Sequence, residues 1–95
     1  MKILLIQGAN MEYLGKREPE LYGTTTAKEL DQLLGKAAEQ LDLQLIIRYT
    51  NIEGEAISWI YEAERTGFEG LIMNPAGFLF SGYALRECLT VSYTH

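Results

Sequence analysis

The chain has 95 residues, 47% of them hydrophobic and 22% charged, a composition typical of one small globular domain and not of a disordered segment. Its net charge of −5 and the lack of any cluster of Lys and Arg argue against a nucleic-acid partner. The sequence has a single cysteine, no signal peptide and no apolar run near the roughly 20 residues of a membrane span. These features predict a cytoplasmic protein with no membrane partner.

The chain opens on a short apolar run, residues 3–6, which ends near Gly8 and leads into a long polar loop, residues 8–23. An apolar run of this length predicts a strand buried on both faces, and loops that leave the carboxyl end of such a strand bind ligands in open α/β sheets. The loop carries Arg17 and Tyr22. A nearby cation favours the phenolate and lowers a tyrosine pKa from its usual value of about 10, so this pair is a candidate general base.

A helix follows this loop. Thr26 and Glu29 have the spacing of a capping box, which predicts a helix start at this point. Apolar residues then recur at helical spacing and form one apolar stripe, made of Leu30, Leu33, Leu34, Ala37, Ala38 and Leu41. Residues 43–49 predict a second strand, and 50–52 its exit loop.

The second half repeats this alternation. Residues 53–65 predict a helix with acidic residues near its start and Gly67 as its terminator. Residues 71–73 predict a third short strand, followed by a loop from Asn74, and another helix begins near Ser81. Strands that alternate with helices imply right-handed crossovers and a parallel sheet. The predicted fold class is therefore α/β, a three-layer sandwich in one domain, residues 1–95.

Three predicted loops leave the same edge of this sheet: residues 8–23, 50–52 and 74–80. Each carries an asparagine close to the end of a strand, namely Asn10, Asn51 and Asn74. We expect the three loops to converge on one cleft. Taken singly, Asn10 and Asn74 also fit turn residues that hydrogen-bond their own backbone, and Tyr22 fits a loop tyrosine with a solvated hydroxyl.

Residues 7–23 resemble the opening signature of the type II 3-dehydroquinate dehydratases. The matching residues are Gln7, Gly8, Asn10, Leu14, Gly15, Arg17, Glu18, Pro19, Tyr22 and Gly23. Residues 50–55 resemble the second loop of that family, and residues 74–77 and 84–87 resemble its third loop and the helix behind it. The resemblance extends from residue 1 to about residue 89.

This resemblance implies a flavodoxin-like fold and the shikimate-pathway conversion of 3-dehydroquinate to 3-dehydroshikimate, through an enolate and without a metal or other cofactor. It implies that Tyr22 takes the proton α to the ketone and that Arg17 keeps Tyr22 ionised. It also implies that Asn10 orders a water that stabilises the enolate oxygen, and that Asn74 binds the substrate.

The sequence also departs from the family pattern. Phe80 stands where the family has a substrate-binding histidine, whereas Ser81 keeps a hydroxyl and is a candidate substrate ligand. Glu87, a further candidate, stands where the family has an aspartate that reaches towards the site of a neighbouring subunit. The family's later Glu-x-His motif, whose histidine protonates the leaving hydroxyl, has no counterpart, and His95 follows Arg86 too closely to replace it. About three strands are therefore expected, without the carboxyl-terminal part of the family domain.

Three functions remain open from the sequence. The first is a dehydratase of this family, and the second is an inactive homologue that serves as an assembly or binding module. The third is a small-anion or nucleotide-binding module of flavodoxin type, although no phosphate-binding glycine pattern follows the first strand. The family resemblance implies a homo-oligomer, a trimer or a dodecamer, on either of the first two interpretations.

Overall fold

The computed structural model describes residues 1–16, 23–80 and 83–92, and within them three parallel strands form one sheet. The central strand is β1 (Lys2–Ala9), flanked by β2 (Gln44–Tyr49) and β3 (Gly70–Ala76). The order β2-β1-β3 is that of the first three strands of a flavodoxin-like sheet. The predicted α/β class with a parallel sheet is confirmed.

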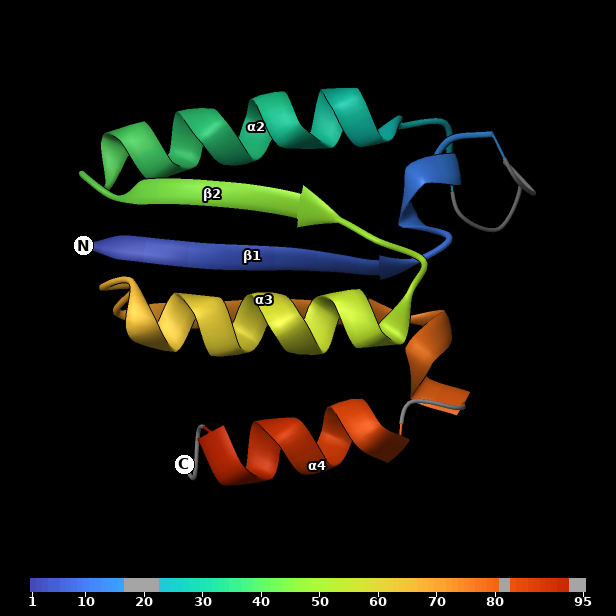
Figure 1. Ribbon diagram of the computed structural model, residues 1–95. Coiled ribbons are helices and arrows are strands. Elements are labelled where there is room, and N and C mark those ends of the chain that lie inside the picture. Colours follow the sequence, from blue (N-terminus) through green and yellow to red (C-terminus); the bar gives the residue numbers. More distant parts are fainter. Residues whose placement is uncertain (17–22, 81–82, 93–95) are drawn as a thin grey trace.

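Helices cover both faces of this sheet (Figure 1). Helix α2 (Ala27–Gln40) lies on one face beside β2, whereas α3 (Glu53–Arg65) and α4 (Tyr83–Ser92) lie together on the other face. The short 3-10 helices η1 (Met11–Tyr13) and η2 (Gly77–Phe80) follow β1 and β3 at the carboxyl edge of the sheet (Figure 1). Within the described ranges, no helix is both long enough and apolar enough to cross a membrane.

The core forms around β1, in which every residue from Leu4 to Gly8 is buried, as the apolar run predicts. Side chains alternate between the faces of a strand. Leu4 and Ile6 therefore point to the same face and pack against residues of α3 and α4, among them Ala56, Ile60, Ala63, Leu85 and Cys88. Burial of side chains such as Ile6 and Ile60 contributes about 1.5–3 kcal/mol each.

The capping box predicted at the start of α2 is present. The Oγ1 of Thr26 accepts a hydrogen bond from the Glu29 backbone N–H at 3.1 Å, and the Glu29 Oε1 accepts one from the Thr26 N–H at 3.2 Å. The predicted apolar stripe is only partly buried, because Leu33 and Leu41 are 61% and 68% exposed. Helix α2 packs mainly against the edge strand β2, so its stripe is wider than the surface that covers it.

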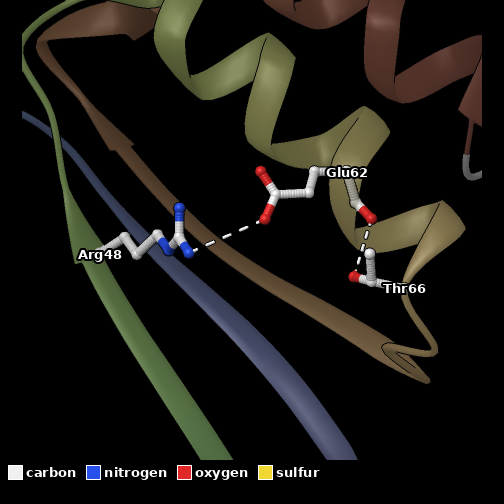
Figure 2. A network of polar contacts seen from close by, with 3 residues as sticks. All are labelled: Arg48, Glu62 and Thr66. Carbon is white, nitrogen blue, oxygen red and sulfur yellow. Dashed lines mark hydrogen bonds and ion pairs between the residues drawn. The ribbon is translucent and has the colours of Figure 1, made fainter.

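Strand β2 is joined to α3 by a small polar network (Figure 2). Arg48 lies opposite Ile6 in the sheet, so its side chain points to the α3 face, where its Nη2 is 4.0 Å from Oε1 of Glu62. The guanidinium also lies 5.2 Å from the centre of the Trp59 ring. Thr66 donates its hydroxyl to the Glu62 carbonyl oxygen at 2.8 Å and so closes the end of α3. The ion pair is exposed and adds little stability.

Candidate active site at the carboxyl edge of the sheet

Two of the predicted asparagines meet directly at the carboxyl edge of the sheet. Asn10 follows β1, and its backbone N–H donates a hydrogen bond to Oδ1 of Asn51 at 2.8 Å. Asn51 lies between β2 and α3, in a turn where the Thr50 hydroxyl oxygen accepts the Ile52 N–H at 2.9 Å. The exit loop of β2 is therefore fastened to the loop that follows β1, as the expected convergence of the loops requires.

Asn74 joins the same cluster, although its place in the fold differs from the prediction. The third strand is longer than residues 71–73 and runs to Ala76, so Asn74 belongs to β3, where it pairs with Gln7 of β1. Its Nδ2 contacts the Sδ of Met11 at 3.5 Å. Likewise, β1 extends to Ala9, so the first loop begins after that residue and not at Gly8. The two strands extend beyond their apolar runs because they pair with each other there, Gln7 with Asn74 and Ala9 with Ala76.

Two glycines allow the strand ends and loops to approach one another this closely. A Cβ at Gly8 would overlap the carbonyl oxygen of Pro75 and would lie 2.9 Å from the carbonyl oxygen of Asn74. A Cβ at Gly77 would lie 3.0 Å from the Cβ of Ala9 and 3.3 Å from the Asn10 Nδ2. The amide of Asn10 is therefore placed against the start of η2, beside the end of β3.

The backbone at this edge holds two non-glycine residues in the left-handed region, Asn10 with φ 73° and Ala76 with φ 48°. Asparagine tolerates this region, but an alanine in it costs about 1–2 kcal/mol. Such strain persists only where the surrounding structure holds it, and it is concentrated at functional sites. The conformations at Asn10 and Ala76 thus mark the same place in the fold as the asparagine cluster.

A row of polar side chains crosses the sheet just before this edge. Tyr49, Gln7 and Asn74 are side by side in the register of β2, β1 and β3 and share the face that α2 covers. The Tyr49 hydroxyl donates to Oδ1 of Asp31 in α2 at 2.7 Å. Burial, the Asp31 hydrogen bond and the charges of Asp31 and Glu12 together raise the pKa of Tyr49 above its usual value of 10, so this tyrosine stays neutral.

Gln7 is the member of this row that sequence reasoning missed as a site residue. Its side chain is only 3% exposed, and its Oε1 has no hydrogen-bond partner in the described part of the chain. One signal for Gln7 was available in the sequence: it is a polar residue directly after a buried apolar run, and it leads towards a ligand-binding edge. An uncharged side chain inside the opening motif, however, gave no reason to prefer Gln7 over its neighbours.

The remaining predicted site residues are not part of this cluster as described. Arg17, Tyr22 and Ser81 lie outside the described residues. Helix α4 is described from Tyr83, close to its predicted start near Ser81. Glu87 is exposed and lines a groove of about 240 Å³ between α3 and α4, with Ile57, Tyr61, Ala84 and Cys88. Neither Asn10 nor Asn74 lines that groove, so this structure does not bring Glu87 to the asparagines.

The described part of the site is uncharged and rich in amides. Asn10, Asn51 and Asn74 present donors and acceptors at an edge where backbone groups are also available, a set suited to hydroxyl and carbonyl oxygens of a small polar molecule. Amide donors held in place stabilise negative charge that develops on such an oxygen. Among the described residues no group of three or more His, Cys, Asp or Glu side chains is placed to hold a metal ion.

Comparison with known proteins gives a consistent result. A family model described as dehydroquinase class II matches residues 1–94. A 3-dehydroquinate dehydratase of Corynebacterium pseudotuberculosis is 42% identical over 89 residues, which are 94% of this chain and 60% of that protein. One of Thermus thermophilus is 38% identical over 87 residues, which are 92% of this chain and 58% of that protein.

Solved structures agree with these sequence matches. The type II dehydroquinase of Butyrivibrio crossotus superposes with a TM-score of 0.92 at 32% identity, over 97% of this chain and 63% of that one. The type II dehydroquinase of Propionibacterium acnes gives a TM-score of 0.85, also at 32% identity, over 94% of this chain and 61% of that one. This chain thus spans about three fifths of the length of the relatives it matches.

Proposed function

This chain belongs to the dehydroquinase class II family, and we propose that it acts as a 3-dehydroquinate dehydratase, a hydro-lyase of the shikimate pathway. The substrate loses a proton α to its ketone and then a hydroxyl group, and 3-dehydroshikimate and water are the products. The single observation that carries the proposal is the cluster of Asn10, Asn51 and Asn74, which gathers three separate family motifs at one edge of the sheet.

In the proposed reaction Tyr22 acts as the base and Arg17 keeps its phenolate ionised. The electron pair of the broken C–H bond moves onto the ketone oxygen, which becomes an enolate. Asn10 orders a water that donates to this oxygen, and Asn74 binds the substrate beside it. When the enolate collapses, the C–O bond breaks and the hydroxyl leaves as water after it takes up a proton.

The geometry of the described residues supports the role of Asn10. The left-handed backbone of Asn10 and its hydrogen bond to Asn51 fix the point where the loop leaves β1, while its Nδ2 lies against Gly77. Because the hydrogen bond to Asn51 holds the Asn10 backbone before any ligand arrives, less of this residue has to reorganise when negative charge develops. Ser81 and Glu87 remain proposed substrate ligands on the family resemblance alone.

Two further properties belong to the proposal. We expect a homo-oligomer, a trimer or a dodecamer, on the family resemblance. Sedimentation velocity of the purified chain tests this, and a monomer at micromolar concentration contradicts it. A cytoplasmic location is also proposed, on the single cysteine.

The activity is tested by the rise in ultraviolet absorbance as 3-dehydroquinate becomes the conjugated product. The purified chain is compared with Tyr22→Phe, which removes one hydroxyl, and with Tyr61→Phe, a matched change at an exposed tyrosine of α3. We expect turnover that falls by about 10²–10⁴-fold in Tyr22→Phe, the range for loss of a general base, and stays constant in Tyr61→Phe.

Two results would contradict the proposal. Equal turnover in the wild type and Tyr22→Phe excludes Tyr22 as the base. No turnover from a chain that is folded by circular dichroism and binds no 3-dehydroquinate by nuclear magnetic resonance (NMR) titration favours the inactive homologue that serves as an assembly or binding module.

A further inference from the structure

Gln7 is a buried residue of β1 to which the proposed reaction gives no task. It is 3% exposed, and its Oε1 has no partner in the part of the chain that the structure describes. A buried acceptor without a hydrogen bond is costly, so such an atom in a folded protein needs an explanation. Its neighbours in the sheet show which donor is within reach.

The register of the sheet gives Gln7 two neighbours on its own face, Tyr49 on one side and Asn74 on the other. Adjacent strands lie about 4.8 Å apart, so both side chains are close to Gln7. The hydroxyl proton of Tyr49 is already donated to Asp31 at 2.7 Å, and a tyrosine has no second proton to give.

Asn74, unlike Tyr49, has N–H donors available. Its amide carries two N–H donors, and the contact that the structure gives it is the 3.5 Å approach of Nδ2 to the thioether sulphur of Met11, a weak acceptor. Unlike Gln7, Asn74 is exposed at the edge of the sheet, so its side chain has room to turn. Side-chain amides on neighbouring strands can hydrogen-bond to one another in this way.

We propose that Gln7 is a positioning residue for Asn74, with its Oε1 accepting a hydrogen bond from the Asn74 Nδ2. This bond turns the amide so that Nδ2 faces the sheet and Oδ1 faces the site. Asn74 then presents an acceptor, which suits a hydroxyl group of the substrate and not a carbonyl oxygen. The inference deepens the proposed function, because it assigns the direction of the bond through which Asn74 binds a polyhydroxyl ligand.

NMR of the isotopically labelled full chain tests the pair without any need for activity. A scalar coupling across the hydrogen bond, from the Asn74 Nδ2 to the Gln7 Cδ, is expected in the wild type. In Gln7→Met, which keeps the length but removes the acceptor, we expect the Asn74 side-chain protons to shift upfield and to exchange with water faster. In Gln7→Glu, which restores an acceptor, the downfield signal returns. Gln44→Met, at the exposed start of β2, is the matched control and leaves these signals unchanged.

Steady-state kinetics then test the consequence for the site. We expect Gln7→Met to raise the KM for 3-dehydroquinate about tenfold, the effect of one lost hydrogen bond, with kcat nearly constant, and Gln7→Glu to recover most of the loss. Identical Asn74 signals in the wild type and Gln7→Met overturn the proposal, as does a wild type without the coupling. If Gln7→Met fails to fold, the wild-type coupling alone decides. An inactive wild type that shows the coupling refutes the dehydratase but keeps the Gln7–Asn74 pair.

Discussion

The backbone N–H of Asn10 donates to the side-chain oxygen of Asn51 at 2.8 Å, and this one bond joins segments that are 41 residues apart in sequence. It holds the loop after β1 against the turn between β2 and α3 at the edge where the proposed site lies. The bond restrains the left-handed backbone of Asn10. In this way it helps to place the side-chain amide of Asn10, a proposed catalytic group.

The first prediction concerns this bond. Asn51→Ala removes the acceptor, and we expect the Asn10 amide to exchange with solvent about tenfold faster and the free energy of unfolding to fall by about 0.5–1 kcal/mol, since the bond is exposed. Hydrogen exchange and urea unfolding measure the two effects. Asn51→Asp keeps an acceptor and serves as the control; an equal loss in both variants would mean that the bond does not order the loop.

The second prediction concerns the start of α2. Thr26→Ala deletes both hydrogen bonds of the Thr26 hydroxyl, the one it donates to the Glu29 Oε1 and the one it accepts from the Glu29 N–H. We expect a loss of about 1 kcal/mol in the free energy of unfolding. Thr24→Ala, two residues earlier and outside the cap, should be nearly neutral. Urea unfolding followed by circular dichroism separates the two, and equal midpoints would contradict the capping role.

The third prediction concerns the close approach of β1 and β3. Gly8→Ala forces a methyl group into the Pro75 carbonyl, so we expect a loss of about 1–3 kcal/mol or a chain that does not fold. Gly35→Ala is the matched control, because nothing lies within 4 Å of its added methyl in α2 and alanine favours a helix by up to about 1 kcal/mol. Thermal unfolding measures both, and a neutral Gly8→Ala would refute the close contact.

The fourth prediction is a dependence of stability on pH. The pKa of Tyr49 is raised in the folded protein by burial and by Asp31, whereas in the unfolded chain it returns to about 10. Folding therefore retains a proton that unfolding releases above pH 10, so the contribution of Tyr49 is complete below that pH and declines above it. The stability difference between the wild type and Tyr49→Phe should shrink from pH 9 to pH 11.

Urea unfolding at several pH values measures this difference, with Tyr61→Phe as a control at an exposed tyrosine of α3. If the difference in free energy of unfolding between the wild type and Tyr49→Phe stays constant from pH 9 to pH 11, the phenol of Tyr49 ionises alike in the folded and unfolded states. If the difference between the wild type and Tyr61→Phe shrinks by the same amount, the effect is a general one of alkaline pH.

Local signals in the sequence were enough for most of the secondary structure. The capping pair at Thr26 and Glu29 set the start of α2, and the acidic first turn with Gly67 set the limits of α3, which runs from Glu53 to Arg65 as predicted. The buried run in β1 and the alternation of strands and helices gave the parallel α/β class. These features depend on residues a few positions apart in the chain, so hydrophobic periodicity and capping motifs are enough to predict them.

Tertiary structure decided the limits of the strands and the composition of the site. Asn74, Pro75 and Ala76 read as a turn, yet they form strand because β1 offers them a partner. Leu33 belongs to the predicted apolar stripe, yet it is exposed because no other described part of the chain covers that side of α2.

The sequence by itself determined the family motif and the three asparagines at strand ends, because each depends on residues close together in the chain. The contacts of the site depend instead on the strand order β2-β1-β3. They are the bond between Asn10 and Asn51, the packing of Gly8 on Pro75, and the row of Tyr49, Gln7 and Asn74. Order and register are set by which faces can be buried together, a property of the whole sheet that no single segment contains.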